Sequence, residues 1–161
     1  MKHLWIAPAL LIAAAAAHAD VKVTFVQTDK FSDIKDNSGF RDETVLKDIE
    51  AHLVEQAQKR LPGRDVTIEV TDVNLAGDVE PVGHNAQWIR VMRTVTLPSL
   101  SMKYTVSEGG KVVKQGETLL RDMNYQDGFN RYSSGDPLRY EKRMIDNWFD
   151  REFRAPVTAS K

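Results

Sequence analysis

Acidic side chains gather between Asp72 and Glu80, and clustered carboxylates of this kind can bind Ca²⁺ through their oxygens. The EF-hand spacing is not met, because Ala76 stands where the fifth ligand belongs and Gly83 where the bidentate glutamate belongs. Asp and Asn side chains also cap turns, which explains the same residues without an ion. We therefore predict no metal site, and an irregular Ca²⁺ site would have to use Asp72, Asp78 and Glu80.

Paired carboxylates could instead hydrolyse a glycosidic bond, a reaction that needs two of them about 5 to 9.5 Å apart. The chain offers these candidates for such a pair: Asp72, Glu80, Asp122 and Asp136. The sequence contains no Gly-x-Ser-x-Gly motif, so it gives no support for a serine nucleophile. His52, a possible base, falls in a helical pattern and is expected at the surface or boundary of that helix. We assign no catalytic residue.

The segment from residue 123 to residue 135 alternates aromatic side chains with polar ones. Long connections of this kind are often binding loops, and aromatic faces beside amides and a guanidinium suit sugars, peptides or protein surfaces. In the alternative interpretation, Tyr125 and Phe129 pack beneath the loop as a small satellite core. We predict Tyr125, Phe129, Arg131 and Tyr132 as the ligand-binding residues.

The first 19 residues have the form of an export signal. Lys2 supplies a positive charge, residues 4–17 are uncharged and rich in Leu, Ile and Ala, and small residues precede Asp20. The apolar run is shorter than the ~20 residues that a helix needs to span a bilayer. We expect cleavage of residues 1–19 before Asp20, and a mature protein that is periplasmic or secreted.

The chain contains no cysteine, which excludes a lipoprotein anchor, disulfides, cysteine-bound zinc and thiol catalysis. Its formal net charge of −1 at pH 7 provides no field to attract nucleic acid. We predict no cofactor, no nucleic-acid partner, no transmembrane segment and no lipid anchor. The expected partner is an envelope protein, a peptide or a glycan.

The periodicity of apolar residues predicts strands where it is two and helices where it is three to four. The predicted strands cover residues 21–25, 66–70, 89–95, 100–106 and 112–122, and the predicted helices cover residues 46–61 and 137–153. Residues 74–87 are expected to form a loop, and Gly116 predicts a bulge in the last strand. Asp136 and Pro137 are expected to start the second helix as its N-cap and first residue.

These elements follow the order β-α-β-β-β(-β)-α. A helix between the first two strands allows them to lie parallel, and the later strands form an antiparallel meander. We predict one α+β domain over residues 20–154, with a mixed, mainly antiparallel sheet of four or five strands and two helices packed on it. Residues 155–161 are expected to form a flexible tail.

Four segments resemble the bacterial secreted proteins grouped as domain of unknown function 3016. They are VKVTF at residues 21–25, VTDVNLAG at 70–77, DMNY at 122–125 and DPLRYEKRMIDNWF at 136–149. The resemblance implies an exported bacterial protein made of one such domain, and it implies no activity, ligand or catalytic residue. Our hypothesis is a non-catalytic periplasmic binding or envelope-associated module, and the alternative is a small carboxylate hydrolase around Asp72, Glu80 and Asp122.

Overall fold

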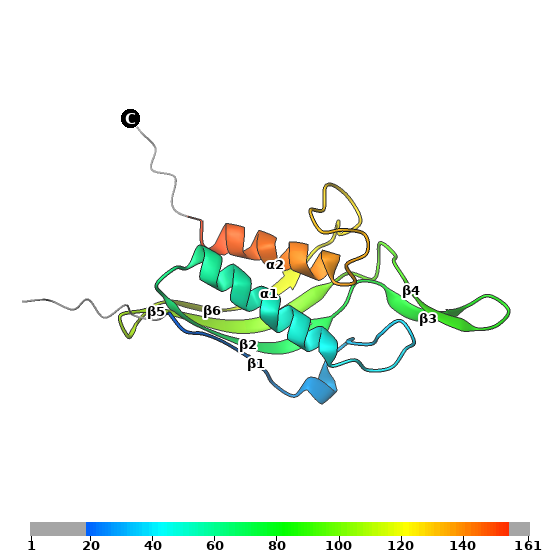
Figure 1. The fold of residues 1–161 in the computed structure, drawn as a ribbon, viewed down its shortest axis with the longest axis horizontal. Helices are drawn as coiled ribbons and strands as arrows, with labels where there is room; N and C mark the ends of the chain where they lie inside the picture. Colours follow the sequence, from blue (N-terminus) through cyan, green and yellow to red (C-terminus); the bar gives the residue numbers. More distant parts are fainter. Residues whose placement is uncertain (1–18, 155–161) are drawn as a thin grey trace, which may run out of the picture.

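The computed structural model describes residues 19–154, and its ribbon is drawn in Figure 1. The elements are β1 (Val21–Phe25), a short 3-10 helix η1 (Thr28–Lys30), α1 (Thr44–Arg60), β2 (Asp65–Asn74), β3 (Asp78–Val82), β4 (Gln87–Val91), β5 (Ser99–Glu108), β6 (Lys111–Arg121) and α2 (Arg139–Glu152). The predicted α+β class and the order β-α-β-β-β-β-α are confirmed. The predicted signal peptide, up to residue 18, and the predicted tail lie outside the described residues.

The main sheet has four strands in the order β1-β2-β5-β6. β1 runs parallel to β2, with Val21 opposite Val66, because α1 carries the chain back between them. The other neighbours are antiparallel: a short turn joins β5 to β6, whereas residues 75–98 connect β2 to β5. The mixed, mainly antiparallel sheet is therefore confirmed.

A separate hairpin of β3 and β4 projects beyond one end of the main sheet (Figure 1). It corrects the predicted loop over residues 74–87. A two-stranded ribbon is exposed on both faces, so its residues need no alternation of apolar and polar types, and Pro81 is tolerated because neither strand is central in a sheet. Gly77 lies at the base of the hairpin, where a Cβ atom would come within 2.6 Å of the carbonyl oxygen of Val91.

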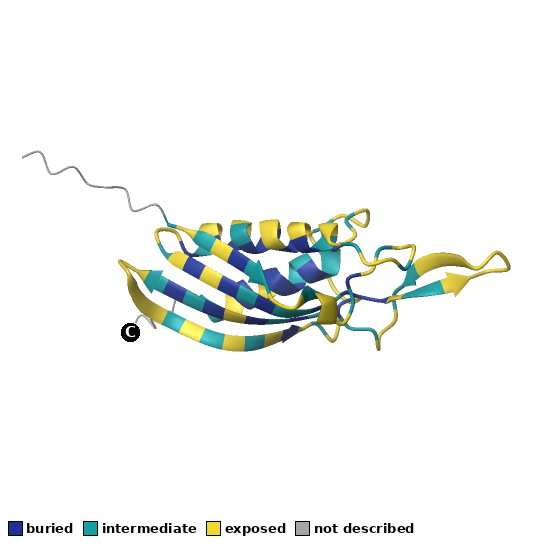
Figure 2. Cartoon of the chain, turned by 90° about the horizontal axis from the view of Figure 1, so that it is seen from below, coloured by how far each residue is buried: buried dark blue, intermediate teal, exposed yellow. Residues whose placement is uncertain are grey.

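The helices α1 and α2 cover one face of the main sheet, and the burial of the strands alternates accordingly (Figure 2). The apolar stripe of α1, which consists of Leu46, Ile49, Leu53 and Ala57, is buried, and so is Trp148 of α2. The core between the layers includes Leu46, Ile49, Leu53, Ala57, Val66, Ile68, Val70, Leu100, Met102, Val106, Met144, Ile145, Trp148 and Phe149. Over residues 19–154, neither helix combines the length and apolar character that crossing a membrane requires.

The predicted bulge at Gly116 is wrong. Gly116 pairs in register with Tyr104, and the register shifts after Val106, where Val113 is the extra residue of β6. The glycine meets a different need, because a Cβ atom there would lie 2.9 Å from the hydroxyl oxygen of Tyr104. That hydroxyl donates a 2.6 Å hydrogen bond to Glu152, so the absent side chain lets a strand residue reach α2.

Helix α2 begins at Arg139, slightly later than the sequence predicts, although Asp136 still accepts a 2.9 Å hydrogen bond from the N–H of Leu138. An ion pair on the solvent side between Lys142 and Asp146 is also expected from their spacing, and this expectation is wrong. Lys142 bonds Asp136 at 2.7 Å, whereas Asp146 is buried and faces α1.

Candidate functional site

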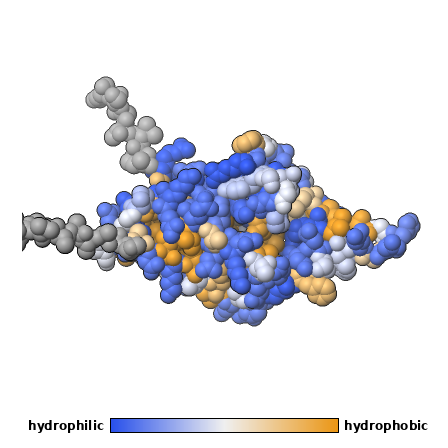
Figure 3. Space-filling view, in the orientation of Figure 1, coloured by the Kyte–Doolittle hydropathy of each residue, from blue (hydrophilic) through white to orange (hydrophobic). Residues whose placement is uncertain are grey.

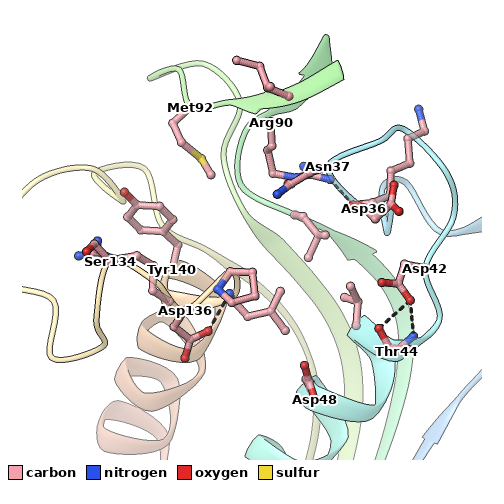
Figure 4. Close-up of a pocket in the computed structure, with 17 residues that line it drawn as sticks. Asp36, Asn37, Asp42, Thr44, Asp48, Arg90, Met92, Ser134, Asp136 and Tyr140 are labelled. Atoms are coloured by element: carbon pink, nitrogen blue, oxygen red, sulfur yellow. Dashed lines mark hydrogen bonds between the residues drawn. The ribbon is translucent and has the colours of Figure 1, made fainter. Parts of the chain in front are cut away.

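A cleft of about 560 Å³ opens where the N-terminal ends of α1 and α2 meet the base of the β3–β4 hairpin (Figure 4). We call it the helix-end cleft. One wall is the loop 35–42 together with β4, and the other is the segment 134–140. Leu75, Val45 and Leu138 supply apolar surface between the walls.

The loop 35–42 is organised by the carboxylate of Asp36. This group accepts hydrogen bonds from the N–H of Ser38 at 2.9 Å, the hydroxyl of Ser38 at 2.7 Å and the N–H of Phe40 at 3.0 Å. The N–H of Asp36 in turn donates to the carbonyl of Phe40 at 2.7 Å. The hydrogen bond from Ser38 is the main reason why the pKa of Asp36 is lowered. These hydrogen bonds therefore stabilise the conformation of the loop.

Arg90 of β4 fastens the hairpin to the rest of the domain. Its guanidinium is buried and forms an ion pair with Asp33 at 2.8 Å. It also donates to the carbonyl oxygen of Gly77 at 3.0 Å and to that of Lys35 at 2.6 Å. One cation thus joins the hairpin base, the preceding turn and the loop wall, and charge-assisted bonds of this kind are strong.

At the start of each helix, beside the cleft, an aspartate accepts hydrogen bonds from the first residues of the helix or from those just before it. Asp42 accepts hydrogen bonds from the N–H of Thr44 at 2.8 Å and from its hydroxyl at 2.6 Å, at the start of α1. At the start of α2, Asp136 accepts from the N–H of Leu138 and pairs with Lys142. Burial would raise the pKa of Asp136, but the bonds from Lys142 and Leu138 outweigh it and the pKa is lowered. Both carboxylates have further acceptor capacity beyond these bonds.

The charges that line the cleft almost cancel. The lining contains four carboxylates and three cations, a difference of −1: Asp36, Asp42, Asp48, Asp136, Lys35, Arg90 and Arg139. Asp48 points from α1 toward the opening (Figure 4). Acceptors and donors therefore surround an apolar floor, an arrangement that can bind an uncharged, polar molecule through many hydrogen bonds.

The predicted binding residues Tyr125 and Phe129 lie in different environments. Tyr125 is 1% exposed, donates to the carbonyl of Arg93 at 2.8 Å, and packs edge to face on Tyr140 with the ring centroids 4.8 Å apart. Tyr140 lines the cleft, so Tyr125 supports its wall from behind. Phe129 is 87% exposed. The structure therefore does not bring these two side chains together.

The other two predicted residues, Arg131 and Tyr132, join a polar network between the helices. The hydroxyl of Tyr132 donates to Asp146 at 2.6 Å, Arg131 pairs with the same carboxylate, and His52 Nε2 lies 3.0 Å from its other oxygen. Burial is the main reason that the pKa of Tyr132 is raised to about 12. We call these four residues the interhelix cluster. His52 is buried, so the expectation of a histidine at the surface or boundary of its helix is wrong.

Among the three calcium candidates, Asp72 and Glu80 have protein partners of their own. Asp72 accepts from the N–H of Ser32 at 2.7 Å and from its hydroxyl at 2.8 Å. Glu80 forms a two-point ion pair with Arg93, while Asp78 is exposed. Over residues 19–154, no three His, Asp or Glu side chains are grouped as they would be around a metal ion.

The carboxylates suggested for hydrolysis each contact a different residue of the protein. Asp122 bonds Arg143 at 2.8 Å, at the end of the sheet, while Asp72 holds Ser32 and Glu80 holds Arg93. Asp136 is the member of that set which lines the helix-end cleft.

Sequence reasoning missed most of the cleft, because its residues come from four separate segments. A signal for one part was present, since Asp42 stands two residues before Thr44 at a helix start, where an aspartate side chain caps free N–H groups. For the interhelix cluster, Ile49, His52 and Gln56 follow helical spacing beside the apolar stripe, which indicates a buried position.

Comparison with curated proteins gives no match. A family model described as protein of unknown function (DUF3016) matches residues 19–151, a range that contains every strand, α1, the helix-end cleft and nearly all of α2. The resemblance found in the sequence is therefore confirmed, and the chain belongs to the DUF3016 family.

Proposed function

We propose that the mature chain is a non-catalytic binding or envelope-associated module of the bacterial periplasm, and that its ligand occupies the helix-end cleft. The export signal over residues 1–19 supports the location. The main support for binding is the cleft itself, because its volume of about 560 Å³ falls in the ordinary range for small-molecule sites.

Hydrogen bonds and an ion pair within the protein hold the walls of this cleft. Asp36 holds the loop 35–42 through four hydrogen bonds, and Arg90 ties that loop to the hairpin base. A site that is already ordered loses little conformational entropy on binding, so more of the contact energy appears as affinity. These groups position the walls and leave Asp48 and Tyr140 for the ligand.

The pKa values support binding over hydrolysis. A glycosidase needs one carboxyl group whose pKa is raised, so that it can protonate the leaving oxygen. In the cleft, the pKa values of Asp36 and Asp136 are lowered instead. Glu141 does have a raised pKa, mainly through burial, but it does not line the cleft.

The test uses arrays of bacterial envelope glycans and peptides, probed with mature protein carrying Asp48→Arg, which puts a long cation into the cleft. The matched control is Glu50→Arg, an exposed acid of α1 outside the cleft. We expect the wild type and the control to bind the same array members, and Asp48→Arg to lose at least tenfold in affinity. Unchanged binding by Asp48→Arg would refute the site. Chemical cleavage of a bound ligand, seen by mass spectrometry, would favour the hydrolase alternative.

A further inference from the structure

A second hollow, of about 380 Å³, lies against the face of the hairpin next to the helix-end cleft. It is lined by Lys35, Ser38, Gly39, Phe40, Val79 and Trp88, and we call it the aromatic pocket. Lys35 lines both hollows, so they adjoin at this residue. The space-filling view shows hydrophobic surface gathered over the hairpin end of the molecule (Figure 3).

Neighbouring residues on one face of strand β4 line the two hollows. Arg90 pairs with Val79 and Trp88 pairs with Pro81, so Arg90 and Trp88 point to the same face of the hairpin. Arg90 lines the cleft and Trp88 lines the aromatic pocket. Two residues along a strand span about 6.5 Å, so these two lining side chains lie about as far apart as neighbouring rings of a chain-like ligand.

The two aromatic side chains of the aromatic pocket are largely exposed and are not part of the core. Trp88 is 50% exposed and Phe40 is 75% exposed, although both belong to well-ordered segments held by backbone hydrogen bonds. Gly39 has a φ of +86°, and a Cβ atom there would lie 3.6 Å from the ring of Trp88. The backbone of the loop therefore approaches one part of the indole and leaves the rest of the ring accessible.

We propose that the aromatic pocket binds a second ring of the ligand that fills the helix-end cleft, and that this ligand is a neutral oligosaccharide of at least two sugar units. The inference rests on the proposed function of the cleft. The C–H face of a sugar packs on an indole or phenyl ring, while the hydroxyl of Ser38 and the ammonium of Lys35 reach the rim of the ring. Each sugar hydroxyl both donates and accepts, which suits the carboxylate of Asp48 and the hydroxyl of Tyr140, the groups of the cleft that are left for the ligand.

The balance of charge favours a neutral chain over a charged one. A strongly charged polymer of either sign would gain little net attraction from a lining with four carboxylates and three cations, whose charges sum to −1. An uncharged polymer of hydroxyl-bearing rings meets a partner for each polar group, with the apolar floor beneath its C–H faces.

The experiment uses the mature protein, whose tryptophans are the half-exposed Trp88 and the buried Trp148. Chito-, cello-, malto- and xylo-oligosaccharides of one to six units are titrated into the wild type while tryptophan fluorescence is followed, and into every variant by isothermal titration calorimetry, which does not depend on Trp88. We expect at least one series to change the emission of the wild type and to gain tenfold or more in affinity from one unit to two. Trp88→Ala and Phe40→Ala should each remove that gain, and Trp88→Phe should keep most of it. Phe129→Ala, which removes an exposed aromatic ring outside both hollows, should change nothing.

The outcomes separate this inference from the proposed function. If the arrays yield a peptide that Asp48→Arg rejects, and no oligosaccharide series binds, the glycan inference is wrong and the binding module stands. If oligosaccharides bind with the same affinity at every length, or if Phe40→Ala leaves the length dependence intact, the aromatic pocket is not a subsite. Circular dichroism of each variant shows that a lost signal is not a loss of folding.

Discussion

His52 Nε2 of α1 and Asp146 Oδ1 of α2 lie 3.0 Å apart at the centre of the helix pair, with side chains 5% and 6% exposed. Tyr132 donates to the second oxygen of the same carboxylate, and Arg131 pairs with it from the solvent side. The interhelix cluster therefore anchors the loop 123–135 to both helices, and the loop in turn places Tyr125 behind the cleft wall.

Asp146→Ala should destabilise the protein by about 3 kcal/mol, because it leaves the buried partners of a desolvated carboxylate unpaired. The control is Asp150→Ala on the same helix, where the carboxylate is 55% exposed and pairs with Arg60. Exposed pairs contribute about 0 to 1 kcal/mol, so the control should stay close to the wild type. Urea unfolding of the mature protein at pH 7 measures both, and equal losses would show that the interhelix cluster adds no stability.

Acid should weaken the folded state through Asp146. Burial would raise its pKa, but hydrogen bonds from His52 and Tyr132 outweigh burial, and the pKa lies below its ordinary value of 3.8. The folded state thus binds fewer protons than the unfolded state, and the stability is present above pH 3.8 and lost as the pH falls through the folded pKa. Unfolding followed from pH 6 to about pH 2 should therefore show a shallower acid decline for Asp146→Asn than for the wild type. Parallel declines would contradict this assignment.

Glu141 should behave in the opposite sense. It is buried, it accepts a 2.7 Å hydrogen bond from the N–H of Ala76, and its other oxygen has no partner among the described residues. Burial raises its pKa above 4.5, so the folded state holds the proton more tightly, and stability falls as the pH rises from 4.5 through the folded pKa. Glu141→Gln should be more stable than the wild type by about 1 kcal/mol at pH 8. Urea unfolding at pH 5 and pH 8 tests this, and an unchanged pH slope would count against it.

The hairpin base should tolerate no side chain at Gly77. Its φ is +77° and a Cβ atom would come within 2.6 Å of the carbonyl oxygen of Val91. Gly83, in the hairpin turn, has the same φ but nothing within 4 Å of that position, so Gly83→Ala isolates the cost of the backbone conformation. We expect a loss of about 1 kcal/mol for Gly83→Ala and about 3 kcal/mol for Gly77→Ala. Thermal melts followed by tryptophan fluorescence compare them, and similar losses would mean that the contact with Val91 relaxes.

Periodicity predicted the layered core because each of its elements buries one face. The stripe from Leu46 to Leu61 and the alternation from Val66 to Val70 correspond directly to buried positions. β3 was missed because it buries neither face against a layer, so no period survives in its residues, whereas β4 overlaps the predicted strand over residues 89–95.

The candidate site was harder to predict, because it depends on contacts between distant segments. His52 and Asp146 are 94 residues apart in sequence, and Arg90 reaches Lys35 across 55 residues. The aromatic and polar composition of residues 123–135 predicted a binding loop, and that prediction stays a prediction. Composition could not show that Tyr125 faces inward while Phe129 faces solvent, since both rings suit either position.

The hairpin is an insertion between β2 and β5, two strands that are neighbours in the main sheet without it. The guanidinium of Arg90 connects it to the rest of the domain, through an ion pair with Asp33 and hydrogen bonds to the carbonyl oxygens of Gly77 and Lys35. Exchanging residues 79–89 for another ribbon would alter one rim of the cleft while the four-stranded scaffold folds as before. The hairpin residues that line the cleft can therefore change independently of the residues that fold the main sheet.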